Sequence, residues 1–223
     1  MTWNLPNILT IGRLLAAPFL AFAFVFLPRG LADWVAIVLF VGAALTDYID
    51  GYLARKWKQE SKFGAMLDPI ADKAMVVIAL MILVGAWDMY PYVVFPAALI
   101  MFREVFVSGL REFLGADAGK LQVTKLAKWK TTAQMVAISL LFAQGVFEHH
   151  FWANTVGMDD GIVSSVLSGN TEDEMGLWFL RTGALATHYA GLWVLWIAAA
   201  LTLITGWDYF NKSRPYLVDE PDA

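Results

Sequence analysis

Residues 47–72 read DYIDGYLARKWKQESKFGAMLDPIAD and contain four aspartates, at positions 47, 50, 68 and 72. Uncharged, mostly apolar runs lie on both sides of this stretch, over residues 34–46 and 74–87. A membrane-spanning helix needs about 20 mostly apolar residues, so each run, extended into the aspartate stretch, predicts one span. The stretch therefore predicts two membrane helices that carry acidic side chains at the same end.

The composition of the whole chain agrees with a membrane location. Of its 223 residues, 59% are hydrophobic and 16% are charged, and the mean hydropathy is +0.57. A soluble domain usually has about 25% charged residues, so a disordered chain, a fibrous repeat and an ordinary soluble enzyme are disfavoured. The chain has no cysteine, which excludes disulfides, thiolate catalysis and cysteine-ligated metal centres. The composition predicts a multi-pass integral membrane protein.

The distribution of basic residues predicts the orientation. Among 16 lysines and arginines, only Arg29, Arg103 and Arg181 lie away from one common set of helix ends. The positive-inside rule places that set of ends, and both termini, in the cytoplasm. The fold class is therefore an all-α integral membrane protein with six transmembrane helices and both termini cytoplasmic, forming a single membrane domain over residues 1–223. The six predicted spans are residues 8–27, 32–54, 67–87, 91–114, 126–147 and 187–207.

Two local features complete this picture. Asn7 or Thr10 is expected to cap the first helix, because asparagine and threonine are favoured at helix N-caps. The connection over residues 148–186 is acidic and rich in Gly, Ser and Asn, so it is expected to face outward with irregular structure. Within it, residues 163–167 and 177–180 predict short helices that lie on the membrane surface.

The aspartates predict a metal site. Asp47 and Asp50 are three residues apart and Asp68 and Asp72 four apart, so each pair shares a helix face. Four carboxylates at one membrane edge repel one another and need cationic compensation. Any one of them could equally be a solvated helix end, but together they favour a hard cation such as Mg²⁺, with Mn²⁺ also possible. The planar fork of nearby Arg55 suits phosphate oxygens. Because the site lies at the lipid boundary, these residues favour a lipid nucleotide as the substrate.

The spacing of these residues resembles a known family motif. Eight fixed positions match the pattern D-x2-D-G-x2-A-R-x8-G-x3-D-x3-D of the CDP-alcohol phosphatidyltransferase family, beginning at Asp47 and ending at Asp72. Four segments are similar to the corresponding segments of family members that use glycerol 3-phosphate: 4–13, 63–73, 103–112 and 128–134. The likeness covers roughly residues 1–147 and resumes in the last span, whereas the connection departs from it by being long.

This resemblance implies an enzyme that transfers the phosphatidyl group of CDP-diacylglycerol to an alcohol and releases CMP. It implies a homodimer in a bacterial-type cytoplasmic (inner) membrane, with the active site on the cytoplasmic side and no nucleic-acid partner. It also implies two Mg²⁺ or Mn²⁺ ions held by Asp47, Asp50, Asp68 and Asp72, with Asp72 as the general base. The donor-binding residues that it implies are Asn7, Thr10, Gly51, Ala54, Arg55 and Gly64.

A phosphorylated acceptor would need further cations. Arg103 lies deep within the span at 91–114 and shares a helical stripe with Arg111, and Lys130 lies near the start of the next span. These three are the expected acceptor-binding residues for glycerol 3-phosphate, although Arg103 could instead pair with a nearby glutamate. Two alternatives remain open: a different acceptor such as phosphatidylglycerol, or a divalent-cation carrier, which would need polar groups at the midplane and often inverted repeats.

Overall fold

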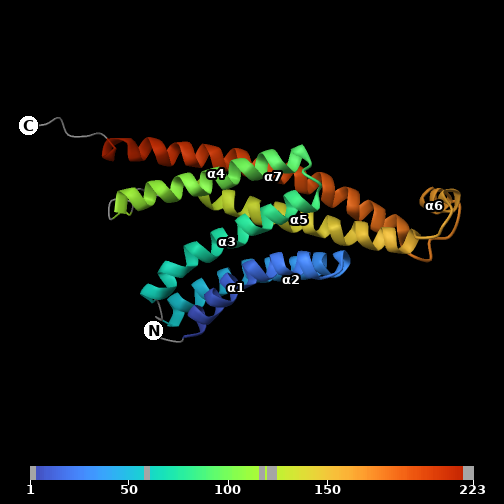
Figure 1. Ribbon diagram of the computed structural model, residues 1–223, viewed down its shortest axis with the longest axis horizontal. Helices are drawn as coiled ribbons and strands as arrows, with labels where there is room; N and C mark the ends of the chain where they lie inside the picture. Colours follow the sequence, from blue (N-terminus) through green and yellow to red (C-terminus); the bar gives the residue numbers. More distant parts are fainter. Residues whose placement is uncertain (1–3, 58–60, 116–118, 120–124, 218–223) are drawn as a thin grey trace, which may run out of the picture.

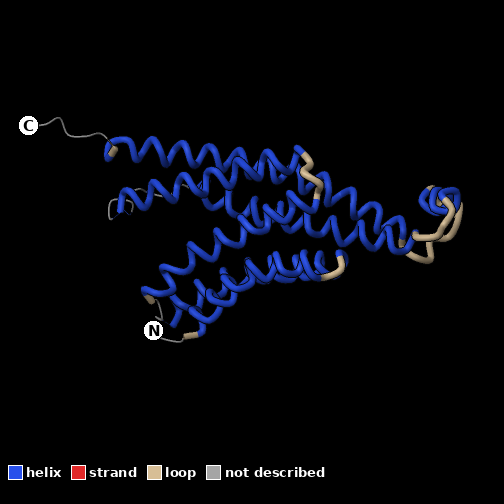
Figure 2. The backbone as a smooth tube through the Cα atoms, viewed as in Figure 1, coloured by secondary structure: helices blue, strands red, loops and turns tan. Residues whose placement is uncertain are grey.

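The computed structural model describes residues 4–57, 61–115, 119 and 125–217, without the side chains of residues 47, 48, 50–55, 125 and 127. Regular structure in this part of the chain is helical, with no strand (Figures 1 and 2). The elements are α1 (Leu5–Phe26), α2 (Arg29–Trp57), α3 (Lys62–Ala86), α4 (Pro91–Leu114), α5 (Lys125–Thr155), α6 (Asp160–Leu167), α7 (Leu177–Ser213) and η2 (Arg214–Tyr216).

The long helices form two groups of three. In the first group α1 packs against both α2 and α3, and in the second α7 packs against both α4 and α5. Contacts of α2 with α5, and of α3 with α4 and α5, join the two groups. The α5–α7 contact is the most extensive, and these two helices project beyond the others toward the short α6 (Figure 1).

The inner and outer faces of the bundle have different chemistry. Phe40 of α2 and Phe142 of α5 are buried and pack edge to face, with ring centroids 6.2 Å apart. Some polar groups in the interior pair across helices, as where the Gln134 amide of α5 donates to the Thr202 hydroxyl of α7 at 3.0 Å. Large apolar side chains on the outer faces are exposed, for example Trp193 on α7. Such an exposed apolar surface suits contact with lipid rather than water.

Five of these helices are long and apolar enough to cross a membrane. In the described part of the chain they are α1, α2 as far as Thr46, α3, α4 and α7. The predicted fifth span falls in α5, which has 31 residues but carries Gln134, Gln144 and Glu148 in its sequence. The membrane class predicted from composition is thus supported, with five helices that qualify on length and composition.

The connection between α5 and α7 is shorter than the predicted range of 148–186. Helix α5 continues to Thr155 and α7 begins at Leu177. The extension of α5 follows from its sequence, because residues 148–155 contain neither glycine nor proline. The helix predicted around 163–167 is confirmed as α6, whereas the separate helix predicted at 177–180 is wrong, since those residues form the first turn of α7.

Asp173 explains why α7 begins where it does. Its carboxylate accepts the backbone N–H of Leu177 at 2.8 Å and that of Trp178 at 2.9 Å. These are N–H groups of the first turn, which have no partner within the helix. Hydrogen bonds from the backbone N–H of Trp178, and then of Leu177 and its neighbours, hold the pKa of Asp173 below its ordinary value. The Asp173 side chain therefore starts α7 at Leu177, ten residues before the predicted span at 187–207.

Candidate active site

The first helix starts earlier than the sequence predicts. Asn4 is the N-cap, and its side-chain oxygen accepts the backbone N–H of Asn7 at 3.1 Å. Pro6 lies in the first turn, where its missing N–H costs nothing. The expectation that Asn7 or Thr10 caps the helix is therefore wrong. Both residues lie inside α1 and are buried, which leaves their side chains available for contacts with a neighbouring helix.

Asn7 makes such a contact with the beginning of α3. Ser61 donates its hydroxyl to Asn7 Oδ1 at 2.8 Å and accepts the backbone N–H of Gly64 at 2.9 Å. A Cβ on Gly64 would lie 2.8 Å from Asn7 Oδ1, closer than packed atoms tolerate. The glycine of the motif is thus required for the close approach of α1 to α3, where a larger side chain would separate the helices.

Two further contacts join α1 to the aspartates of α3. Thr10 donates its hydroxyl to Asp68 Oδ1 at 2.8 Å. Arg13 forms an ion pair with Asp72, with 2.6 Å between Nη1 and Oδ1. The Arg13 side chain is 1% exposed and that of Asp72 is 40% exposed, so a buried guanidinium presents a carboxylate that solvent or substrate can reach. The face of α1 that packs against α3 therefore orients both α3 carboxylates.

Arg13 was not predicted as a site residue. Its position at the start of the first span is typical of a positively charged anchor at the membrane surface, but it is buried and paired. A sequence signal for this role exists. Asn7, Thr10 and Arg13 recur every three residues, and this spacing places polar groups on one helix face.

The backbone places the two aspartate pairs at matching depths. Asp47 lies ten residues before the end of α2, and Asp72 ten residues after the start of α3. At 1.5 Å per residue each is about 15 Å along its helix from the connection between them. Asp50 and Asp68 are about 10 Å from the same connection by the same measure. The order of the four residues along the two helices is thus compatible with one shared site.

The metal-binding prediction can be compared with the structure only in part. Asp68 and Asp72 lie one turn apart on α3, while the side chains of Asp47 and Asp50 lie outside the described residues. Among the described side chains, no group of three or more His, Asp or Glu residues forms a cluster. The chemistry of the described pair fits a hard cation, because carboxylate oxygens are the ligands that Mg²⁺ prefers. Three predicted donor-binding residues, Gly51, Ala54 and Arg55, also lie outside the described side chains.

The predicted acceptor residues surround a glutamate. Arg103 Nη1 lies 3.3 Å from Glu104 Oε1, and Lys130 forms an ion pair with the same oxygen. The three side chains are 12%, 11% and 7% exposed in the order Arg103, Glu104, Lys130. Pairing of Arg103 with a glutamate, which the sequence left open, is present. Arg103 and Lys130 are thus brought together by a residue that was not predicted as part of the site.

Arg111, the third predicted residue, lies two turns along α4 from Arg103. Its guanidinium is 5.3 Å from the centroid of the Tyr209 ring on α7, in reach of a cation–π interaction. A second contact connects this region to the aspartate helix, because Lys73 donates to the Ser108 hydroxyl at 2.5 Å. Lys73 directly follows Asp72 in sequence, so the helix of the carboxylates and the helix of the arginines are joined beside the site.

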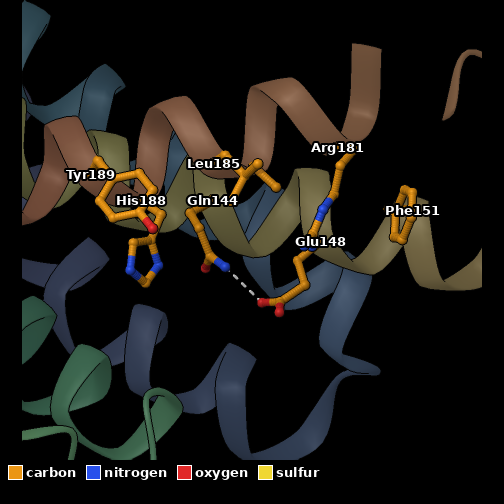
Figure 3. Close-up of a pocket in the computed structure, with 8 residues that line it drawn as sticks. Gln144, Glu148, Phe151, Arg181, Leu185, His188 and Tyr189 are labelled. Carbon is orange, nitrogen blue, oxygen red and sulfur yellow. Dashed lines mark hydrogen bonds between the residues drawn. The ribbon is translucent and has the colours of Figure 1, made fainter. Parts of the chain in front are cut away.

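A cavity of about 240 Å³ between α5 and α7 lies apart from all these residues. Gln144, Glu148, Arg181 and His188 are among the residues that line it (Figure 3), and none of the predicted site residues does. Within it, the Gln144 amide donates to Glu148 at 2.7 Å. The carboxylates of α3, rather than this cavity, therefore define the candidate active site.

The fold and the site together define a class of protein. It is an all-helical membrane protein with partly exposed carboxylates on one helix and a buried basic cluster on the neighbouring helices. A sequence profile described as CDP-alcohol phosphatidyltransferase matches residues 3–204. The chain belongs to the CDP-alcohol phosphatidyltransferase family, which confirms the resemblance seen in the aspartate motif.

Individual relatives match over almost the entire chain. A protein of Cereibacter sphaeroides named CDP-diacylglycerol–glycerol-3-phosphate 3-phosphatidyltransferase is 57% identical over 220 residues, with 99% of this chain and 100% of the relative covered. Proteins with the same name from Salmonella choleraesuis and Escherichia coli are 34% and 33% identical over 223 residues, with the same coverage. That the connection between α5 and α7 is longer than in relatives stays a prediction.

Proposed function

We propose that this chain transfers the phosphatidyl group of CDP-diacylglycerol to the 1-hydroxyl of sn-glycerol 3-phosphate, giving phosphatidylglycerophosphate and CMP. The observation that carries the proposal is the full-length similarity to relatives named for this reaction, at 57% identity. The chain is an enzyme of phospholipid biosynthesis, and its substrates follow from the same similarity. The geometry around α3 supports the chemistry, because it presents ordered carboxylates at one end of the bundle.

Asp47, Asp50, Asp68 and Asp72 are the proposed ligands of two Mg²⁺ or Mn²⁺ ions. When bound, such ions polarise the pyrophosphate and neutralise charge on the departing CMP. The contribution of the protein is to fix the ligands. The hydrogen bond from Thr10 orients Asp68, and groups that orient metal ligands in this way commonly affect metal affinity by 10- to 100-fold.

Asp72 is the proposed general base. The reaction forms a bond between the acceptor oxygen and the phosphorus that carries the diacylglycerol, and breaks the bond from that phosphorus to CMP. The proton of the acceptor hydroxyl passes to a carboxylate within hydrogen-bond reach. The ion pair with Arg13 fixes the position and direction of this carboxylate. The half-exposed position of Asp72 gives substrate access to it.

The donor is proposed to bind along the same edge. Gly51 and Ala54 leave room for the cytidine end, and Arg55 contacts the donor phosphates. Asn7, Thr10 and Gly64 belong to this edge as well, where their contacts hold α1 close to α3. The donor-binding residues of α1 and α3 are thus proposed to act by shaping the edge as well as by contact.

The proposed topology has six spans, with α5 as the span that composition alone does not identify. Its 31 residues extend over about 46 Å, more than the roughly 30 Å of a bilayer core. Two of its buried polar groups are paired within the protein, Gln134 with Thr202 and Lys130 with Glu104, which removes much of the cost of placing them in the membrane. Both termini and the aspartates are proposed to face the cytoplasm, in a homodimer in the bacterial inner membrane.

An assay of the purified protein tests the function. CDP-diacylglycerol would be offered with glycerol 3-phosphate, phosphatidylglycerol or serine in turn, and CMP release followed. Release only with glycerol 3-phosphate is expected. Preferential use of phosphatidylglycerol would identify that lipid as the acceptor instead. CMP release with none of the three acceptors, together with uptake of divalent cations into reconstituted vesicles, would favour a divalent-cation carrier.

Arg103, Arg111 and Lys130 are the proposed acceptor-binding residues, and substitution of either arginine by alanine should weaken acceptor use. A charge-assisted hydrogen bond contributes roughly 1.5–3 kcal/mol, so the KM for glycerol 3-phosphate should rise by about 10- to 100-fold. The KM for CDP-diacylglycerol should change little. Arg181→Ala, at the opposite end of the bundle, is the control and should alter neither constant. A defect confined to the donor would contradict the assignment.

A further inference from the structure

Tyr209 contains a buried hydroxyl whose role the fold does not explain. The residue is 7% exposed on α7, and within the described part of the chain its hydroxyl has no hydrogen-bond partner. Buried polar groups are nearly always paired, so the exception requires an explanation. Tyr209 forms a buried cluster with Val107 and Leu114 of α4, and Val107 lies one turn from Arg103 and one turn from Arg111. The unpaired hydroxyl thus belongs to the region of the proposed acceptor site.

Arg103 has a similar unpaired atom on the facing helix. Its Nη1 pairs with Glu104, yet its Nε is buried and finds no partner among the described residues. Gly206 precedes Tyr209 by one turn on α7, and a Cβ there would come within 2.9 Å of Arg103 Cγ. The missing side chain lets Arg103 lie against α7. Two polar atoms without partners therefore occur on the contacting faces of α4 and α7.

The charge of this region identifies the class of ligand. Arg103 and Lys130 share the single carboxylate of Glu104, and Arg111 adds a third cation against the Tyr209 ring. Three cations against one anion leave an excess of about two positive charges. A phosphate monoester carries about −1.5 to −2 charges at neutral pH and offers three strong acceptor oxygens. It therefore balances the charge and supplies the acceptors that both unpaired groups lack.

We propose that Tyr209 is a further acceptor-binding residue, whose hydroxyl donates a hydrogen bond to the phosphate group of the acceptor beside Arg103 Nε. The inference rests on the proposed function for the identity of the acceptor, while the position of the phosphate rests on the unpaired atoms. Glu104 supports the site by holding Arg103 and Lys130 at one point, so that the cations are placed before the ligand arrives.

Tyr209→Phe tests this role because it removes one oxygen and keeps the ring that Arg111 contacts. The KM for glycerol 3-phosphate should rise about tenfold, the loss of about 1.4 kcal/mol, while the KM for CDP-diacylglycerol stays the same. A buried hydroxyl without a partner is costly, so the melting temperature of the variant without ligand should be unchanged or higher. Tyr189→Phe, on the same helix but exposed, is the matched control and should change none of these values.

Binding without turnover separates this proposal from the proposed function. Glycerol 3-phosphate or inorganic phosphate, added without CDP-diacylglycerol, should raise the melting temperature of the wild type more than that of Tyr209→Phe. If the wild type released no CMP but showed this difference, the reaction would be wrong and the anion site would stand. Equal ligand stabilisation and equal acceptor KM in both proteins would overturn the proposal, as would a lower melting temperature with equal losses for both substrates.

Discussion

Replacing Asp68 by asparagine is expected to lower the rate of CMP release by roughly a thousandfold while the protein still folds. Asparagine keeps the size of the side chain and an oxygen that can accept the hydrogen bond from Thr10, but it removes the negative charge. A catalytic metal ion stabilises the transition state by several kcal/mol, and about 4 kcal/mol corresponds to a factor of a thousand. Asp47→Asn and Asp50→Asn should have effects of similar size.

Metal binding provides a second measurement that does not depend on activity. Equilibrium binding of Mn²⁺, followed by electron paramagnetic resonance, should weaken in each of the three variants. Asp208→Asn is the matched control, because Asp208 is a half-exposed aspartate of α7 that pairs with Lys212, and such surface pairs contribute little. Wild-type turnover in excess chelator at the rate seen with Mg²⁺ would refute the metal-dependent mechanism.

The individual helices could be predicted from sequence where the signals that begin and end them are local. The predicted span 91–114 coincides with α4, because Pro91 lies in its first turn and Gly115 follows its end with a positive φ of 50°. The prediction for α1 was less accurate at its start, since Asn4 caps the helix and lies outside the apolar run. The signal that begins α7, Asp173, also lies outside the apolar segment that identifies the span.

The candidate site was predictable to the extent that its residues lie on one helix. Spacing alone places Asp68 and Asp72 on one face of α3. The pairing of Arg13 with Asp72 depends on how α1 packs against α3. The three-residue spacing within α1 indicates a polar face, but it does not specify which helix that face meets. Tyr209 carried no signal at all, because a tyrosine near the end of a membrane helix is typical of the interfacial belt. Its position against α4 is a property of the packed bundle.

Asp72→Asn is expected to reduce kcat by about 10²- to 10⁴-fold, the range for loss of a general base, with a much smaller effect on CDP-diacylglycerol binding. An amide cannot accept the proton of the acceptor hydroxyl, although it fills the same space and can still accept a hydrogen bond from Arg13. Single-turnover rates and equilibrium binding of the donor, measured on the same preparation, separate the two effects. Asp68→Asn is the comparison, since loss of a metal ligand alone should weaken metal and donor binding together.

A substitution of Arg13 tests whether Asp72 acts as the general base or only as a metal ligand. Arg13→Lys keeps a positive charge beside Asp72 but loses the planar group that orients the carboxylate at 2.6 Å. If Asp72 accepts the proton, the direction of its carboxylate matters, because proton transfer requires hydrogen-bond reach to the acceptor hydroxyl. The kcat of Arg13→Lys should therefore fall by roughly tenfold. Donor affinity should be retained, because the charge near the site is unchanged. If turnover and donor binding fall in equal proportion in both Asp72→Asn and Arg13→Lys, Asp72 acts only as a metal ligand, and another group must accept the proton.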